Sequence, residues 1–144
     1  MASVIIVDNV AFERVTLKDI VAQTGHEVVA ELNSGFDLLK AYARLQPDFV
    51  IMDITFPDDD GMEILRELFQ KHPDAKVCIC TAMAQQATII QAIQLGAKDF
   101  IVKPYNAERI KESLKKHAQK THILEKVGNF TIILSGSNSL QDSE

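Results

Sequence analysis

The sequence predicts an α/β protein in which helices cover both faces of a parallel five-stranded sheet, the doubly wound arrangement. Five short apolar runs are each followed by a stretch with apolar residues at helical spacing. Small polar or charged residues stand directly after four of these runs. Strand–helix alternation calls for parallel strands joined by right-handed crossovers. The carboxyl ends of all five strands therefore share one rim of the sheet.

The predicted strands are short runs of apolar and β-branched residues. The run at 49–53 is apolar up to its final aspartate, which is typical of a strand buried on both faces of a parallel sheet. The run at 27–32 is less apolar, so we expect it nearer an edge. The complete set of strands is predicted at 3–7, 27–32, 49–53, 76–80 and 99–102.

A helix is predicted after each strand from apolar residues three or four positions apart. Gly25 and Gly96 favour helix ends. Pro47 and Pro73 cannot continue a helix, and Asn106 is a suitable N-cap. The apolar stripes of the five helices are Leu17, Ile20 and Val21; Leu38, Leu39 and Tyr42; Ile64, Leu65, Leu68 and Phe69 in a helix at 61–71; Ile89, Ile90 and Ile93 in a helix at 85–95; and Ile110 and Leu114.

The chain of 144 residues is long enough for one domain and too short for two ordinary ones. Its net charge of −5 argues against a nucleic-acid-binding surface, which usually carries a basic stripe. No basic-then-apolar leader follows Met1, and no apolar run approaches the ~20 residues of a membrane span, so we expect a cytoplasmic protein. Cys78 and Cys80 suit neither a disulfide nor a zinc pattern and are expected in the core.

Five polar residues each lie at the carboxyl end of a predicted strand or directly after it, and they are expected to meet at the rim of the sheet. They are Asp8, Asn9, Asp53, Thr81 and Lys103. Oxygen ligands without cysteine or histidine suit Mg²⁺, which binds one or two carboxylates together with waters and phosphate oxygens. A lysine and a threonine hydroxyl there can bind phosphoryl oxygens. With an aspartate as nucleophile, this set suffices for phosphoryl transfer through an aspartyl-phosphate.

Each of these residues also has an ordinary structural explanation. Asp8 or Asn9 can cap the first helix. Asp53 can belong to a turn, Thr81 can simply end a strand, and Lys103 can be a surface lysine. Taken singly, the ordinary roles are favoured. Their position at successive strand ends of one sheet favours a common site.

Several short motifs carry a family resemblance. They are Ile6-Val7-Asp8-Asn9, Met52-Asp53-Ile54-Thr55-Phe56-Pro57 with Gly61, Thr81-Ala82, Gly96-Ala97-Lys98-Asp99-Phe100 and Ile101-Val102-Lys103-Pro104. Over roughly 3–118 the sequence resembles a receiver domain of the two-component response-regulator family, closest to single-domain chemotaxis regulators of the CheY type. The resemblance implies the (βα)5 flavodoxin-like receiver fold with strand order 2-1-3-4-5.

By this resemblance, Asp53 is the phosphoacceptor and takes a phosphoryl group from a sensor histidine kinase or a small phosphodonor. Thr81 and Lys103 bind the phosphoryl group, and Thr81 and Phe100 are the switch residues. The surface of the fourth helix, fifth strand and fifth helix then changes its affinity for a downstream protein. The Lys103–Pro104 bond is expected to be cis. Mg²⁺ is expected among Asp8, Asn9, the Asp53 carboxylate and the Thr55 backbone carbonyl.

Asn9 departs from the family pattern, in which a second acid usually follows the first strand and binds the metal directly. An amide oxygen can coordinate Mg²⁺ but brings no charge, so we expect weaker metal binding and a gain of affinity in Asn9→Asp. The acids Asp58, Asp59 and Asp60 can compensate in part through the local field, although a solvated loop is the favoured explanation for them.

Three other functions compete with a phosphorylated switch. A pseudo-receiver would act by protein contact alone; Asn9 favours it, whereas Asp53, Thr81 and Lys103 argue against it. A phosphatase of the haloacid-dehalogenase class normally carries a second aspartate two residues after its nucleophile, where this chain has Thr55. A nucleotide-binding domain lacks support because no glycine-rich loop follows the first strand. We therefore expect a switch that catalyses only its own phosphorylation and dephosphorylation.

The chain divides into a receiver domain at 1–120 and a C-terminal extension at 121–144, with an additional strand expected at 130–134. That strand is expected at an edge of the sheet or across a dimer. The expected partners are a histidine kinase and a downstream protein such as the flagellar switch, without nucleic acid or membrane. A monomer or weak dimer is expected.

Overall fold

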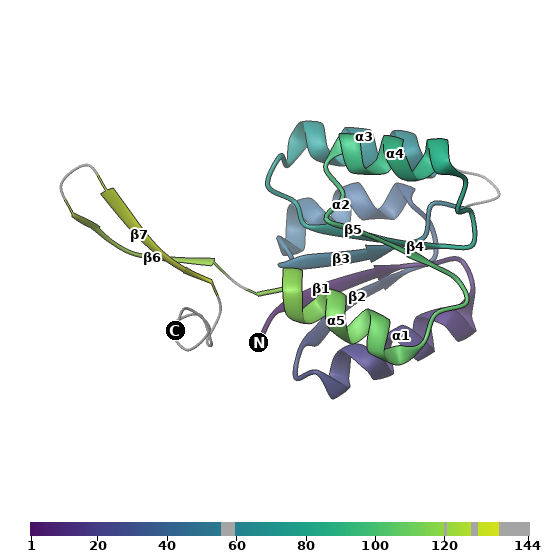
Figure 1. Cartoon of the computed structure of the whole chain (residues 1–144), viewed down its shortest axis with the longest axis horizontal. Coiled ribbons are helices and arrows are strands. Elements are labelled where there is room, and N and C mark those ends of the chain that lie inside the picture. Colours follow the sequence, from purple (N-terminus) through teal and green to yellow (C-terminus); the bar gives the residue numbers. More distant parts are fainter. Residues whose placement is uncertain (56–59, 120, 128–129, 136–144) are drawn as a thin grey trace.

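The computed structural model describes residues 1–55, 60–119, 121–127 and 130–135. Five parallel strands form one sheet in the order β2-β1-β3-β4-β5, which confirms the predicted topology (Figure 1). β2 lies at an edge, as its less apolar sequence predicts. The strands are β1 Ser3–Val7, β2 Glu27–Leu32, β3 Phe49–Met52, β4 Val77–Thr81 and β5 Asp99–Val102.

Five helices cover the two faces of this sheet. α1 and α5 pack together on one face, and α2, α3 and α4 pack on the other (Figure 1). The Asn106 side chain accepts a hydrogen bond from the Arg109 amide at 2.9 Å and caps α5, as predicted. The helices are α1 Ala11–Gln23, α2 Phe36–Leu45, α3 Gly61–Lys71, α4 Gln86–Leu95 and α5 Ala107–His117.

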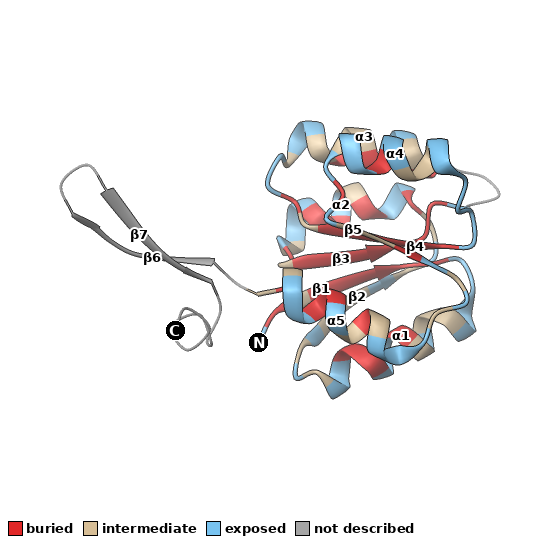
Figure 2. Ribbon diagram, viewed as in Figure 1, coloured by how far each residue is buried: buried red, intermediate tan, exposed pale blue. Residues whose placement is uncertain are grey.

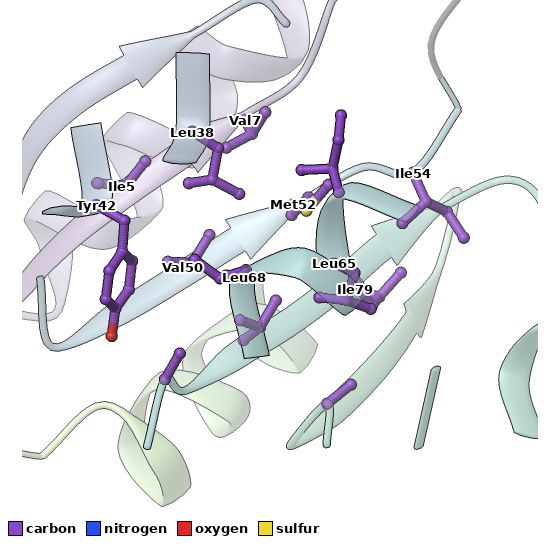
Figure 3. Close-up of a cluster of buried hydrophobic side chains, with 14 of the residues drawn as sticks. Ile5, Val7, Leu38, Tyr42, Val50, Met52, Ile54, Leu65, Leu68 and Ile79 are labelled. Atoms are coloured by element: carbon purple, nitrogen blue, oxygen red, sulfur yellow. The ribbon is translucent and has the colours of Figure 1, made fainter. Parts of the chain in front are cut away.

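The inner strands β1, β3 and β4 are buried along most of their length, whereas the edge strands β2 and β5 are mostly intermediate or exposed. The helices alternate between buried and exposed residues (Figure 2). Alternate residues of β1 face opposite sides: Ile5 belongs to the cluster beneath α2, α3 and α4, and Ile6 to the cluster beneath α1 and α5. Figure 3 shows side chains of the first cluster, among them Met52 and Leu65. The sheet is therefore a central layer with a separate apolar core on each face.

Cys78 and Cys80 lie in the core beneath α1 and α5, and both are free thiols, as the sequence predicts. Burial raises the pKa of Cys78 to about 12. Burial also raises the pKa of Cys80. Both side chains are therefore neutral packing groups at physiological pH.

α4 differs from the other helices in how it uses its apolar residues. Only Ala92 is fully buried, and Ile90 and Ile93 are about half exposed. The helix packs on α3 and on the edge strand β5, so part of its apolar surface has no covering element among the described residues. The apolar pattern predicts the helix but not which side of it is covered.

The described part of the C-terminal extension forms a hairpin of β6 Thr121–Val127 and β7 Phe130–Ser135. The two strands pair antiparallel in a sheet of their own, instead of lengthening the main sheet (Figure 1). The strand expected at 130–134 falls within β7, whereas β6 was not anticipated. In β6 the adjacent apolar residues Ile123 and Leu124 break the alternation of a strand, and the pairing shifts register at this point.

Candidate functional site

Four strands bring their polar ends to one part of the rim. Asp8, Asp53 and Lys103 follow β1, β3 and β5, and Thr81 ends β4. Backbone hydrogen bonds continue the sheet into this region. The Asp53 amide donates to the Val7 carbonyl at 2.9 Å, and the Lys103 amide donates to the Thr81 backbone carbonyl at 2.9 Å. The Lys103–Pro104 bond is cis, as predicted.

Lys103 lies at the centre of this arrangement. Its Nζ donates to Asp8 Oδ2 at 2.7 Å and to Asp53 Oδ2 at 3.0 Å. The Lys103 side chain is only 12% exposed, and those of Asp8 and Asp53 are 1% and 7% exposed. Burial favours a lower pKa for Lys103, but hydrogen bonds and charge attraction from the two aspartates outweigh burial and raise its pKa above the usual value. Lys103 is therefore a fixed positive charge across the physiological pH range.

The two carboxylates are oriented in the same way. The second oxygen of Asp8 accepts a hydrogen bond from the Val10 amide at 2.9 Å, and that of Asp53 accepts one from the Thr55 amide at 2.8 Å. Each aspartate therefore uses one oxygen to hold the following turn and the other to bind Lys103. The capping role considered for Asp8 and the turn role considered for Asp53 coexist with a place in the shared cluster.

Thr81 is fully buried at the end of β4. Its hydroxyl lies 2.9 Å from the Thr55 hydroxyl and accepts a hydrogen bond from the Met83 amide at 3.2 Å. The Thr55 side chain thus links the loop after β3 to β4, and its backbone amide holds the Asp53 carboxylate. From the sequence, a role is expected only for the backbone carbonyl of Thr55, as a ligand of Mg²⁺.

The other predicted site residues lie further from this cluster of direct contacts. Asn9 is exposed beside Asp8. Phe100 is partly buried against the core beneath α2, α3 and α4, three positions before Lys103 in the chain. Asp60 caps α3 by accepting from the Met62 and Glu63 amides. Asp58 and Asp59, together with Phe56 and Pro57 of the motif, lie outside the described residues.

Two residues of α1 reach the site and were missed from the sequence. Glu13 Oε1 lies 4.0 Å from Lys103 Nζ. Arg14 donates to the backbone carbonyl of Asp8 at 2.6 Å. The available signal was their position in the first turn of α1, the helix that begins at the rim directly after Asp8 and Asn9.

The oxygen atoms of the rim suit a hard divalent cation. Asp8 and Asp53 each direct one oxygen to the same lysine nitrogen, so both carboxylates border one small region. Within the described residues, no three histidine, cysteine, aspartate or glutamate side chains gather in a metal-binding arrangement. Two carboxylates are nevertheless enough for Mg²⁺, which completes its shell with water and other oxygens. The donor set therefore fits the predicted ion.

Comparison with known families decides the relationship of the chain. Residues 4–115 match the model of the response regulator receiver domain. The chain belongs to this family. The match leaves out the C-terminal hairpin and includes every residue of the rim described above, so the receiver domain comprises the five-stranded sheet and its helices.

Individual relatives of the receiver domain are chemotaxis proteins. Chemotaxis protein CheY of Thermotoga maritima is 47% identical over 113 residues, which are 78% of this chain and 94% of that protein. Chemotaxis protein CheY of Listeria monocytogenes is 46% identical over 119 residues, which are 83% of this chain and 100% of that protein. The receiver domain is therefore of the CheY type, and its family is that of two-component signalling.

Solved structures agree with this assignment. The crystal structure of the CheX–CheY–BeF3–Mg²⁺ complex of Borrelia burgdorferi contains a chain that matches with a TM-score of 0.76 and 26% identity, covering 79% of this chain and 87% of that one. A response regulator receiver domain protein of Clostridium thermocellum matches with a TM-score of 0.75 and 25% identity, over 82% of this chain and 94% of that one. The flavodoxin-like receiver fold is confirmed.

No helix among the described residues combines the length and the apolar content needed to cross a bilayer. The helices of the receiver domain are at most 13 residues long, and each packs on the sheet or on another helix.

Proposed function

We propose that this receiver domain accepts a phosphoryl group on Asp53 from a sensor histidine kinase, in a reaction that requires Mg²⁺, and thereby changes its affinity for a downstream protein. The observation that carries this proposal is the position of the Asp53 carboxylate. It is nearly buried, yet it lies at the rim and directs one oxygen to Lys103 at 3.0 Å. Asp53 is thus an oriented carboxylate beside a permanent cation.

The chemistry follows from this arrangement. A carboxylate oxygen of Asp53 attacks phosphorus, the P–N bond of the phosphohistidine donor breaks, and the new O–P bond forms an aspartyl-phosphate. Lys103 then pairs with a phosphoryl oxygen, which offsets part of the added negative charge. Bound Mg²⁺ would neutralise further charge on the transferred group, held by Asp8, Asn9, Asp53 and the Thr55 carbonyl. Positioning and charge neutralisation are sufficient for this class of reaction.

The signal would pass from Thr81 to the surface. The Thr81 hydroxyl leaves Thr55 and binds the phosphoryl group, and Phe100 turns inward as the space beside it changes. The proposed output surface is supported by the exposed apolar side chains of α4, β5 and the preceding loop, because exposed apolar groups gather where proteins bind partners. They are Met83, Ile90, Ile93 and Val102.

The protein would act as a switch and not as an enzyme with an external substrate. Its partners would be a sensor histidine kinase and a downstream protein, of which the flagellar switch is one candidate. The alternative is a pseudo-receiver that works by protein contact alone. Asn9 is the observation that favours this alternative, because it removes one acidic charge from the metal site.

Intact-mass spectrometry after incubation with acetyl phosphate separates the two functions. We expect one added phosphoryl group in the native chain with Mg²⁺ and none without it. Asp53→Asn should remain unmodified under both conditions, and its circular dichroism should match that of the native chain. No adduct on the native chain, together with no Mg²⁺ binding, would leave the pseudo-receiver as the function.

A further inference from the structure

We propose that Glu13 is a positioning residue of this site: it supplies the acidic charge that Asn9 lacks, and it becomes the partner of Lys103 when Mg²⁺ occupies the two aspartates. This role rests on the proposed function, because it concerns the metal-bound state. Neither the family motifs nor the pattern of strand ends assigns a function to this position. The inference comes from the contacts of Lys103.

Lys103 has three acidic neighbours at graded distances. Asp8 and Asp53 lie within direct hydrogen-bonding range, at 2.7 and 3.0 Å, whereas Glu13 Oε1 lies at 4.0 Å. The Glu13 side chain is 29% exposed, so it can change rotamer without disturbing the core. Glu13 is therefore close enough to attract the ammonium group and free enough to approach it.

Metal binding creates the need for such a partner. Mg²⁺ held by Asp8 and Asp53 would compete with Lys103 for these two carboxylates, and it would place two positive charges beside a third. The Lys103 side chain is only 12% exposed, so water screens this repulsion poorly. A carboxylate close to the ammonium group lowers the cost, and Glu13 is the remaining acid in contact range of Lys103 among the described residues.

The charge balance leads to the same residue. Asp8, Asp53 and Glu13 carry three negative charges and Lys103 one positive charge, which leaves two negative charges to match Mg²⁺. Asn9 contributes none, and Glu13 stands four positions later in the chain, in the first turn of α1. Arg14 does not enter this count, because it contacts the backbone carbonyl of Asp8 and not the cluster of side chains around Lys103. Its positive charge nevertheless makes a nearby acid more favourable.

Glu13 also has an ordinary explanation. An acid in the first turn of a helix interacts favourably with the helix dipole. That role predicts a small effect of Glu13 on folding stability and no specific effect on metal affinity. The two roles therefore differ in what a substitution does to Mg²⁺ binding.

The test is a titration of the full-length, unphosphorylated chain with MgCl₂, followed by amide chemical shifts in NMR. Glu13→Gln should weaken Mg²⁺ binding about fivefold, as expected for one partly exposed charge near the ion. Glu13→Ala should behave in the same way. The matched control is Asp19→Asn, an exposed acid further along α1 with the same change in net charge, which should leave the affinity unchanged.

Two further measurements distinguish a charge effect from a structural one. Asn9→Asp in the Glu13→Gln background should restore the affinity, because the charge returns at the other position. Raising the NaCl concentration from about 0.05 to about 0.5 M should reduce the difference in Mg²⁺ affinity between Glu13→Gln and the native chain, because salt screens the charge of Glu13. Equal Mg²⁺ affinities of Glu13→Gln and Asp19→Asn would overturn the role of Glu13 but leave the proposed function intact. If the native chain bound no Mg²⁺, both the proposed function and the role of Glu13 would be overturned.

Discussion

The hydroxyl oxygens of Thr55 and Thr81 lie 2.9 Å apart, which joins the loop after β3 to the end of β4. The Thr55 amide also donates a hydrogen bond to the Asp53 carboxylate. Thr55 therefore contacts both the proposed phosphoacceptor and the proposed switch residue. If Thr81 moves toward the phosphoryl group, as proposed, its hydrogen bond with Thr55 breaks. Thr55 therefore sets part of the free-energy difference between the two states of the switch.

Thr55→Val should favour the phosphorylated state. Valine retains the shape of threonine but removes the hydroxyl, so Thr81 no longer gives up that hydrogen bond when it moves. One such bond contributes about 1 kcal/mol, so affinity for beryllofluoride in the presence of Mg²⁺ should rise about fivefold. Calorimetric titration measures this change. Thr55→Ser keeps the hydroxyl and should bind as the native chain does; equal affinity of the valine variant would contradict the prediction.

Lys103→Met should destabilise the metal-free protein and increase its stabilisation by Mg²⁺. The change leaves Asp8 and Asp53, whose side chains are 1% and 7% exposed, facing each other without their shared cation. Removing one partner of a buried ion pair costs about 3 kcal/mol. Urea unfolding should show this loss without Mg²⁺ and a partial recovery with it, since the ion can replace the missing charge.

The control for Lys103 is Lys111→Met. Lys111 pairs with Glu108 on the surface of α5 at 3.7 Å, and a pair of this kind contributes little. Its substitution should change the free energy of unfolding by less than about 0.5 kcal/mol, with no dependence on Mg²⁺. Similar losses for the two lysine variants would show that the buried cluster does not depend on Lys103.

The sheet and its rim could be predicted because both follow from local patterns. Buried parallel strands are uninterrupted apolar runs, and the right-handed crossover places all their carboxyl ends together. Asp8, Asp53, Thr81 and Lys103 are therefore neighbours in any sheet built from these five runs. Their meeting required no knowledge of the side-chain conformations.

Contacts that depend on side-chain direction could not be predicted in this way. Glu13 reaches Lys103 across 90 residues of sequence, and the Thr55 hydroxyl meets Thr81 from a loop whose course the sequence does not specify. The apolar spacing of α4 likewise predicts a helix without showing that Ile90 and Ile93 remain about half exposed. These features are determined by the packing of whole elements, which no local pattern encodes.

Gly61→Ala should destabilise the domain through the loop that carries Asp53. A Cβ at position 61 would lie 2.4 Å from the carbonyl oxygen of Ile54, a backbone atom that cannot move without shifting its neighbour Asp53. Overpacking of this kind costs about 2 kcal/mol. Guanidinium unfolding measures the loss, and Mg²⁺ affinity should fall as well.

Gly25→Ala provides the contrast for Gly61. Its Cβ would meet no atom within 4 Å, but the backbone has a φ of +82°, which a side chain adopts only with strain. We expect a loss of about 1 kcal/mol and no change in Mg²⁺ affinity, because Gly25 follows α1 at the opposite end from the rim. A decrease in Mg²⁺ affinity in Gly25→Ala equal to that in Gly61→Ala would show that the effect is not local to the Asp53 loop.

Arg109→Met should lower stability in a way that depends on pH. Arg109 donates to both oxygens of Asp99, at 2.7 and 3.0 Å. Burial favours a higher pKa for Asp99, but the hydrogen bonds from Arg109 outweigh it and lower the pKa below its usual value. A lowered pKa in the folded state means that the ionised carboxylate stabilises the fold above the unfolded pKa of about 3.9, and that this contribution disappears as the pH falls through the folded pKa.

The difference in the free energy of unfolding between native chain and Arg109→Met should therefore be about 1 kcal/mol at pH 7, a value reduced by the partial exposure of the arginine. This difference should stay constant down to about pH 4 and fall toward zero at lower pH. Urea unfolding at pH 7, 5 and 3 measures this dependence. In the background of Asp99→Asn, which cannot ionise, the effect of Arg109→Met should be small and the same at every pH. If the native chain and Arg109→Met still differed by the same free energy of unfolding at pH 3, Arg109 would act through packing and not through the charge of Asp99.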